Sequence, residues 1–318
     1  MADQITITHL IERIPDEASA YAYLEGLRWP EKPVCPHCGS INDHYFLKPK
    51  NEAGRRTRTG NVSQRRVWKC KDCRKQFSVL TGTIFHGSKV PVRIWLFVFF
   101  EMCANKNGIA AREIERKYAV APKTAWFMTQ RIREAMKSRG APMTGVFHAD
   151  ETWIGADTTK MNAKQRAARE KKLAGTKSKT TKTTVFALIE ERSGEVRAKV
   201  VPNVKASTLR QAIAENAQAF GSILRTDSLR SYTSIGHRFA KHETVDHLAG
   251  QYVSATGSST NKVENFFGQL KRSIDGTHHH VSREHLDRYV SEFAFRHSTC
   301  KQTDTERMGQ IAAQTGGR

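Results

Sequence analysis

The sequence predicts a multi-domain α/β protein in which a zinc ribbon and a helical region precede a mixed sheet with flanking helices. Three observations predict this order. Two CxxC pairs lie in the first quarter of the chain, helical patterns fill residues 81–140, and strand patterns alternate with helical ones from Gly145 onward. The 318 residues are enough for two domains or three small ones.

The charge of the chain indicates its class of partner. Lys and Arg number 52 against 31 Asp and Glu, which gives a formal net charge of +21. Such an excess is typical of nucleic-acid binders, although ribosomal and membrane-surface proteins can share it. The longest apolar run, residues 94–100, is too short to span a bilayer, and residues 1–17 lack a signal-peptide pattern. We therefore expect a cytoplasmic protein with no membrane partner.

The N-terminal part is expected to hold a helical leader over residues 1–30 and a zinc ribbon over residues 31–80. In a reducing compartment, paired CxxC units are far more often a zinc site than disulfides. Four thiolates close a tetrahedral site with one structural Zn²⁺ and leave no open position for catalysis. The predicted zinc ligands are Cys35, Cys38, Cys70 and Cys73.

A basic segment follows the first knuckle of the ribbon. Residues 55–75 contain nine Lys or Arg and one Asp. A solvated loop would have this composition too, but the charge of the whole chain favours contacts with phosphates. Together with basic residues of the later helices, the candidate DNA contacts are Arg55, Arg56, Arg58, Arg65, Arg66, Lys123, Arg131, Arg133, Lys271 and Arg272.

Residues 81–140 are expected to be a helical DNA-binding region. Pro91 can occupy the first turn of a helix that ends at Gly108, a shorter helix follows, and Pro122 opens a basic helix that stops at Gly140. A short helix, a turn and a basic helix fit a helix-turn-helix. Three-helix packing without a DNA role gives the same pattern, so both interpretations stay open.

Residues 141–300 are expected to form a single α/β domain. The order is a strand ending near Asp150, a basic loop over 160–182, a hairpin over 183–203 that turns at Ser193–Gly194, and a helix over 206–220 with Phe220 near its apolar stripe.

A fourth strand is predicted to deliver Asp227 at its end, and a late helix begins near Asn261. Residues 301–318 are set apart as a C-terminal tail.

Three acidic residues of this domain form the candidate catalytic set. Asp150, Asp227 and Glu264 are far apart in sequence, so only a fold in which the first and fourth strands are neighbours, with the late helix across their ends, brings them together. Three carboxylates there would repel one another unless divalent cations bridge them. Two Mg²⁺ or Mn²⁺ ions about 3.5–4 Å apart can clamp a phosphodiester for in-line attack. Lys271, seven residues after Glu264 and so on the same helix face, is expected to hold a phosphate.

Each member has a plainer interpretation. Asp150 can be a strand-end turn residue, with the neighbouring Glu151 as the ligand instead. Asp227 can cap the helix that follows it, and Glu264 can pair with Lys262 or Lys271. The histidines 278–280 invite a metal interpretation, but no fourth ligand is evident and a polar loop is the simpler account.

The chain resembles the DDE transposases of bacterial insertion sequences, in the group with an N-terminal zinc ribbon. The runs that carry the resemblance are CPHCGS, WKCKDCRKQFSVLTGTIF, KTAWFMTQRIR, DETWIG, STNKVENFFGQLKR and GTHHHVSREHLDRYVSEFAFRH, within residues 30–297. The resemblance implies a ribonuclease-H-like catalytic domain that cuts and joins DNA. By the matching motifs, the three acids fall on Asp150, Asp227 and Glu264, with the associated basic residue at Lys271.

These observations lead to two hypotheses of different classes. The first is a metal-dependent transposase that acts on double-stranded DNA, both its own element ends and a target, as at least a dimer. The second is a zinc-ribbon and helix-turn-helix regulator derived from a transposase that has lost catalysis. A plain nuclease is a third, weaker option. The acidic set discriminates between them, because a pure binder has no need of three carboxylates in one place.

Overall fold

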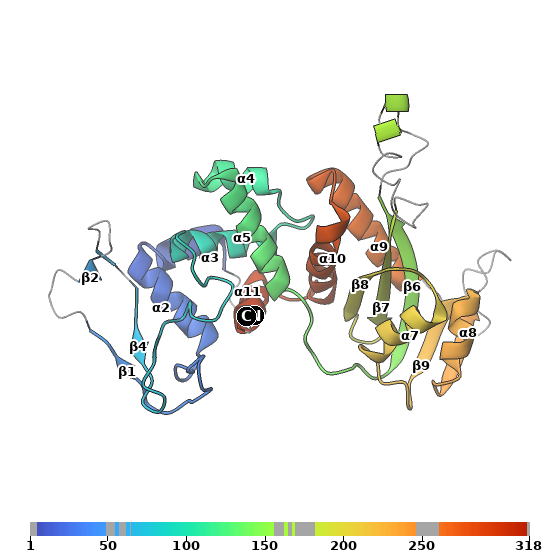
Figure 1. The fold of residues 1–318 in the computed structure, drawn as a ribbon, viewed down its shortest axis with the longest axis horizontal. Coiled ribbons are helices and arrows are strands. Elements are labelled where there is room, and N and C mark those ends of the chain that lie inside the picture. The colour runs from blue at the N-terminus through green and yellow to red at the C-terminus, as the bar shows by residue number, and fades with distance from the viewer. Residues whose placement is uncertain are drawn as a thin grey trace. The chain divides into compact units, whose positions relative to one another are not determined.

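The chain forms two compact units, which are described separately in this computed structural model (Figure 1). The described residues are 5–48, 55–56, 62–63, 65–155, 162–164, 167–168, 182–245 and 261–316. One unit comprises Met1–Met136 and Lys301–Arg318, and the other comprises Lys137–Cys300. No helix in these described ranges is long and apolar enough to cross a membrane.

The first unit is built around helix α3, Val92–Ala104, whose aromatic and aliphatic residues are nearly all buried. The other helices are α1 (Ile7–Arg13), α2 (Glu17–Arg28), α4 (Ala111–Tyr118), α5 (Pro122–Ala135) and α11 (Asp304–Ala313). Helix α11 packs against α2, α3 and α5. The segment set apart above as a C-terminal tail therefore contains a helix of this unit, which begins with a capping box between Thr303 and Glu306.

The ribbon has very short strands. Strands β1 (Tyr45–Phe46), β4 (Trp68–Lys69) and β5 (Gln76–Phe77) form an antiparallel sheet, and β2 (Arg55–Arg56) pairs with β3 (Val62–Ser63). Glu25 of α2 ties the ribbon to the helices, because its carboxylate accepts hydrogen bonds from Trp68 Nε1 at 3.0 Å and from Arg66 Nε at 2.7 Å.

Helices α4 and α5 pack against each other and are joined by residues 119–121, with Ala119 in the left-handed region at φ 48°. The length of this connection is compatible with a helix-turn-helix and equally with the three-helix packing that the sequence left open. Pro122 occupies the first turn of α5, as the sequence predicts.

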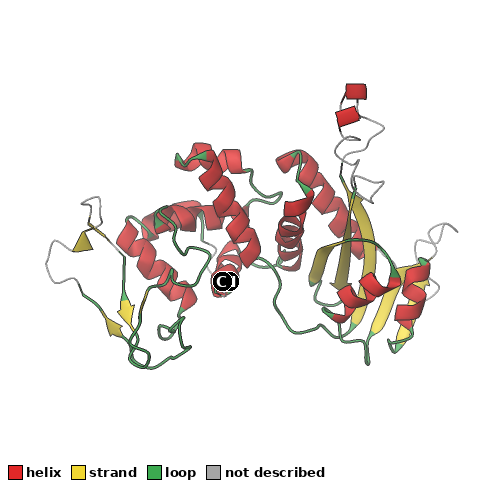
Figure 2. Cartoon of the chain, in the orientation of Figure 1, coloured by secondary structure: helices red, strands yellow, loops and turns green. Residues whose placement is uncertain are grey.

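The second unit contains one mixed five-stranded sheet, with helices on both faces (Figure 2). Its strands are β6 (Val146–Ile154), β7 (Thr183–Glu190), β8 (Val196–Val201), β9 (Ile223–Asp227) and β10 (Lys241–Val245), in the spatial order β10-β9-β6-β7-β8. Strand β7 is antiparallel to β6 and β8, whereas β9 is parallel to β6 and β10. The predicted adjacency of the first and fourth strands is confirmed.

Each face of the sheet has its own core. Phe147, Ala149 and Leu224 pack with α7 (Ala206–Ala214) and α8 (Arg230–Gly236), and Val185 and Ala187 pack on the other face. That second face is covered by α9 (Asn261–Ser273) and α10 (Arg283–Ser298), with the π-helical turn η2 (Ile274–His278) between them.

Three details of this unit differ from the sequence prediction. Strand β6 continues four residues past Asp150, because β7 pairs with it as far as Ile154. Helix α7 ends at Ala214, and Phe220 is 88% exposed, so it belongs to no apolar stripe. Residues 241–245, for which the sequence predicted no element, form a strand that pairs with β9.

Candidate active site

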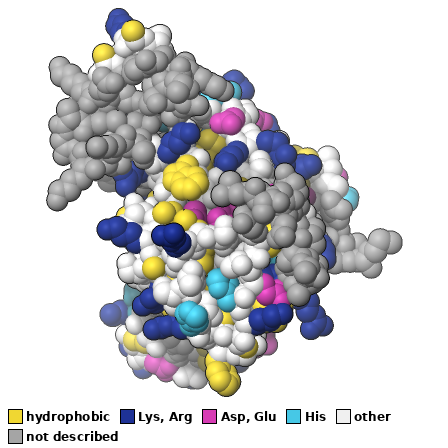
Figure 3. Space-filling model, turned by 90° about the vertical axis from the view of Figure 1, so that its right-hand side faces the viewer, with side chains coloured by type: hydrophobic (Ala, Val, Ile, Leu, Met, Phe, Trp, Pro, Cys, Tyr) yellow, Lys and Arg dark blue, Asp and Glu magenta, His cyan; other side chains and the backbone are white. Residues whose placement is uncertain are grey.

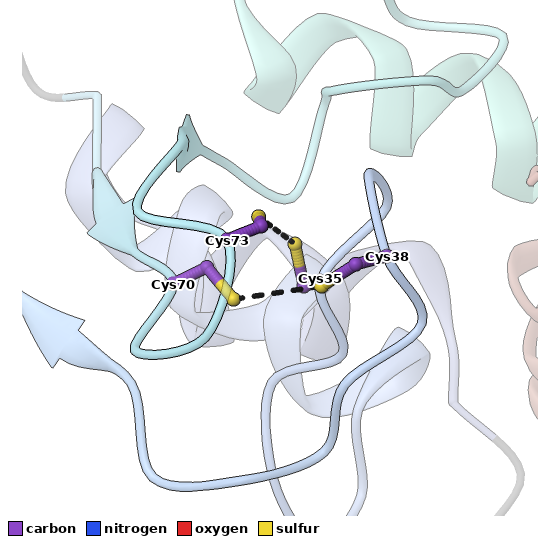
Figure 4. A group of neighbouring side chains, drawn as sticks. All are labelled: Cys35, Cys38, Cys70 and Cys73. Atoms are coloured by element: carbon purple, nitrogen blue, oxygen red, sulfur yellow. Dashed lines mark hydrogen bonds between the residues drawn. The ribbon is translucent and has the colours of Figure 1, made fainter.

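The four predicted zinc ligands lie together in the first unit (Figure 4). Their sulfur atoms are all within 4.8 Å of one another, and the Cys35–Cys73 and Cys38–Cys70 sulfur pairs are both 3.7 Å apart. Zinc–sulfur bonds of about 2.3 Å in a tetrahedron place sulfurs about 3.8 Å apart. The spacing of the cluster therefore fits one structural Zn²⁺ with all four positions taken by protein.

Asp150 and Asp227 lie on the adjacent parallel strands β6 and β9. The register pairs Val146 with Ile223 and continues to His148 with Arg225. Each aspartate lies two residues beyond this last pair, so both occupy the same level and the same face. That face is the one covered by α9 and α10, because Asp150 pairs across β7 with Ala187 of their core.

Helix α9 brings Glu264 and Lys271 to the same side of the sheet. Val263, Phe266 and Leu270 are buried in the core, and the helix packs on β6 and β7. Glu264 and Lys271 are exposed, and each directly follows a buried residue, Val263 or Leu270, so they border this apolar stripe. The sequence predicted this helix across the ends of β6 and β9, and the structure places it on β6 and β7, with its buried face fixed by apolar residues at helical spacing.

The three acids do not converge as closely as the cysteines. Within the described ranges, the cysteines form the one group of three or more His, Cys, Asp or Glu with such close ligand atoms. Carboxylate oxygens are nevertheless the donors that Mg²⁺ and Mn²⁺ prefer, and like charges oppose closer approach without a cation. The donor chemistry of Asp150, Asp227 and Glu264 fits divalent metal. On the face of the molecule in Figure 3, a few acidic side chains lie among Lys and Arg side chains.

Glu151 points to the opposite face of the sheet from Asp150. It is 8% exposed, and its Oε2 accepts a 2.6 Å hydrogen bond from the hydroxyl of the fully buried Tyr232 in α8. Burial first of all, and then the charges of Asp150 and Asp227, raise the pKa of Glu151 to about 7 in spite of the tyrosine hydrogen bond. Burial and the same three carboxylates raise the pKa of Tyr232 well above its usual value. No local pattern indicates this pair, because its members are 81 residues apart in the chain.

The other plain interpretations have mixed outcomes. Asp227 Oδ1 accepts a hydrogen bond from the Leu229 backbone N at 3.1 Å, so it does support the turn into α8. Lys262 Nζ donates a hydrogen bond to the backbone carbonyl oxygen of Glu191 at 2.6 Å and lies 4.0 Å from the Glu191 carboxylate. His278 stacks edge-on against Tyr289 with ring centroids 4.8 Å apart, which fits a packed turn.

A network of ion pairs lies below the aspartates and was not anticipated. Arg225 of β9 bonds Glu191 at 2.7 Å and Glu243 at 2.8 Å, and His148 Nε2 lies 3.8 Å from Glu191. This network joins β6, β9, β10 and the turn after β7. It lies two residues before Asp150 and Asp227 on their strands, and so fixes these strands relative to one another.

The candidate DNA contacts separate into several groups. Lys123, Lys271 and Arg272 are exposed. Arg65 donates to Ser78 Oγ, Arg66 is paired with Glu25, and Arg131 donates to the backbone carbonyls of Ile84 and His86 while lying over the Phe127 ring. The side chains of Arg55, Arg56 and Arg58 lie outside the described residues.

Arg133 requires a correction. It is 1% exposed, so its guanidinium cannot reach a phosphate in this conformation. The charge of Arg133 predicted an exposed side chain, but α5 directs this side chain toward the core of the first unit.

Both parts of the chain that match a known family match a transposase domain. Residues 142–298 match the ISXO2-like transposase domain, and residues 15–76 match the transposase zinc-ribbon domain. A protein of the transposable element ISH50 from Halobacterium salinarum is 25% identical over 306 residues, which cover 95% of this chain and 97% of that protein.

Two retroviral structures have a weak similarity to part of this chain. The catalytic core of bovine immunodeficiency virus integrase (BIV integrase) has a TM-score of 0.32 at 15% identity, over 48% of this chain and 83% of that one. An intasome of simian T-cell lymphotropic virus, in complex with a phosphatase regulatory subunit, has a TM-score of 0.28 at 15% identity. It covers 57% of this chain and 63% of that one. The second unit has the mixed sheet with flanking helices expected of a ribonuclease-H-like domain.

Proposed function

Because this chain belongs to the insertion-sequence transposases that carry an N-terminal zinc ribbon, we propose that it binds the ends of its own element and catalyses metal-dependent DNA cleavage and strand transfer. The observation that carries the proposal is the common level of Asp150 and Asp227 on adjacent parallel strands, with α9 packed on the same face. A metal site shared by carboxylates of two neighbouring strands requires this arrangement.

In this proposal Asp150, Asp227 and Glu264 hold two Mg²⁺ or Mn²⁺ ions. Bound ions of this kind activate a water or a 3′-hydroxyl and stabilise the leaving oxygen. The protein contributes position: β6 and β9 hold two carboxylates rigidly, and α9 carries Glu264 on a helix anchored by its buried face. Lys271 is exposed on α9 two turns after Glu264, and in this proposal it holds a phosphate of the DNA strand that is cut.

The positive charge of the chain supports duplex DNA as the substrate. A net charge of +21 favours phosphate contacts over a large surface. Coordinated cutting and joining at two element ends also calls for at least a dimer on DNA. A monomer in every DNA-bound complex, measured by light scattering, would overturn that part of the proposal.

The deciding experiment measures cleavage and joining of a labelled duplex that carries the element end, with Mg²⁺ or Mn²⁺. The variant is Glu264→Gln, and the matched control is Glu284→Gln, an exposed glutamate at the start of α10. We expect Glu264→Gln to abolish both reactions and to keep DNA binding, while the control keeps all three. If the unaltered protein binds the duplex but cuts it under neither metal, the chain is a DNA-binding regulator derived from a transposase.

A further inference from the structure

The hydroxyl of Tyr232 and the carboxylate of Glu151 lie directly beneath the two aspartates, on the other face of the sheet. Glu151 follows Asp150 on β6, and Tyr232 lies in α8, which begins three residues after Asp227. One hydrogen bond of 2.6 Å thus joins the chain segment after the first acid to the helix after the second.

The surroundings make this bond a rigid connection. Tyr232 is fully buried and packs in the core with Phe147, Ala149 and Leu224 of the same two strands. A carboxylate as buried as Glu151 needs a partner, and within the described ranges the hydroxyl of Tyr232 is the hydrogen-bond donor to it. A short bond between a carboxylate and a hydroxyl in such a site is strong and directional.

Strand β9 pairs with β6 only as far as Arg225, two residues before Asp227. At the level of the aspartates, backbone pairing between these strands has therefore ended. The Arg225 ion pairs hold the strands two residues earlier, and the Glu151–Tyr232 hydrogen bond joins the two segments beyond that point.

We propose that Tyr232, acting through Glu151, is a positioning residue that sets the separation of Asp150 and Asp227 for divalent-metal binding. This inference rests on the proposed function of the two aspartates as metal ligands. The bond acts on the aspartates through the β6 backbone, because Glu151 lies on the opposite face and does not itself bind the metal.

The test measures the affinity of the full-length protein for Mn²⁺ in the absence of DNA. Free Mn²⁺ is quantified by its electron paramagnetic resonance signal. Tyr232→Phe removes only the hydroxyl, and we expect about a tenfold weaker affinity, the lower end of effects measured for residues that orient metal ligands. The matched control is Tyr118→Phe, which removes a hydroxyl from a tyrosine–glutamate hydrogen bond to Glu101 in the other unit. We expect this control to leave Mn²⁺ affinity unchanged.

A rescue variant separates position from charge. Glu151→Gln keeps an oxygen that accepts from Tyr232, so we expect Mn²⁺ affinity within about threefold of the unaltered protein, well short of the loss on removing an orienting residue. An equal or larger loss than in Tyr232→Phe would overturn the inference and make Glu151 a direct ligand. A lower melting temperature in Tyr232→Phe with unchanged Mn²⁺ affinity would also overturn it, because the bond would then serve stability alone.

Asp150→Asn in the same titration reports on the proposed function independently. If Asp150→Asn abolishes Mn²⁺ binding and Tyr232→Phe has no effect, the metal site stands and the positioning role falls. If Asp150→Asn binds Mn²⁺ as the unaltered protein does, the proposed metal site falls, and the inference falls with it.

Discussion

Asp150 and Asp227 occupy the same level of the adjacent parallel strands β6 and β9, two residues beyond the last paired residues, His148 and Arg225. Glu151 lies behind them, and both aspartate charges raise its pKa. This concentration of negative charge on two adjacent strands is costly without a counterion, which is typical of a site shaped for function more than for stability.

Asp150→Asn should separate activity from stability. The asparagine oxygen can still accept the hydrogen bond that Asp150 Oδ1 accepts from the Glu151 backbone N at 2.8 Å. We expect cleavage to fall by about 10³-fold, since a lost metal ligand removes several kcal/mol of transition-state stabilisation. The melting temperature without Mg²⁺ or Mn²⁺ should rise, because one repelling charge is gone. A lower melting temperature would contradict the repulsion that we infer.

Loss of one cysteine of the zinc cluster should remove the metal. We expect about one Zn²⁺ per chain by mass spectrometry of the metal content, and a loss of bound zinc in Cys70→Ser. Zinc contributes about 10–16 kcal/mol to the folding of zinc-finger peptides, so the ribbon should become sensitive to proteolysis. The control is Cys300→Ser, an exposed cysteine outside the cluster, which should keep its zinc.

Gly236→Ala should destabilise the second unit. A Cβ at this position would lie 2.1 Å from His242 Nδ1, and His242 is held by a 3.0 Å contact between its Nε2 and Thr226 Oγ1. Overpacking of this kind costs about 1–3 kcal/mol in urea unfolding.

Gly268→Ala is the control for this prediction, and its expected effect on stability has the opposite sign. It lies inside α9, and a Cβ there would meet only Arg272 Nη1 at 3.9 Å. Replacement of an interior helical glycine should stabilise the protein by about 1 kcal/mol. Equal effects of the two substitutions would contradict the packing around His242.

Acid should weaken the second unit through His297. Burial lowers the pKa of His297 below its usual 6.5, and its ring packs edge-on against Phe266 with centroids 5.7 Å apart. The folded state therefore favours the neutral ring. Its contribution is fully present above pH 6.5 and is lost as the pH falls toward the lowered value.

We expect His297→Gln to flatten the fall of unfolding free energy between about pH 7 and pH 5, the range in which a histidine titrates. The control is His280→Gln, an exposed histidine of the same unit, which should leave the slope unchanged. The difference between the two variants cancels acid effects on the zinc cluster.

Lys271→Gln should reduce the salt dependence of binding to duplex DNA. Loss of one phosphate contact lowers the slope of log affinity against log salt by about 1. The control is Lys199→Gln on β8, whose ammonium is already paired with Glu215. An unchanged slope for Lys271→Gln would exclude the proposed phosphate contact.

Part of the candidate site follows from local patterns. The CxxC spacing identifies the zinc ligands, because a knuckle is a local structure with its own geometry. The end of β9 at Asp227 and the start of α9 at Asn261 follow from strand and helix patterns within a few residues.

Other parts depend on residues that meet only in the fold. The charge of Arg133 does not reveal that its helix turns it inward, and nothing near Glu151 indicates Tyr232 as its partner. Strand β6 looks complete at Asp150 until β7 is seen to pair with it as far as Ile154.

The sequence by itself determined the four-cysteine cluster and the class of most elements, and through family motifs it nominated the three acids as candidates. Only the tertiary structure decided that Asp150 and Asp227 share one level, that Glu151 faces away from them, and that residues 304–313 form a helix of the first unit. The physical reason is range. Backbone propensity and knuckle chemistry act between neighbours in the chain, whereas strand register and core packing are set by contacts between residues that are distant in sequence.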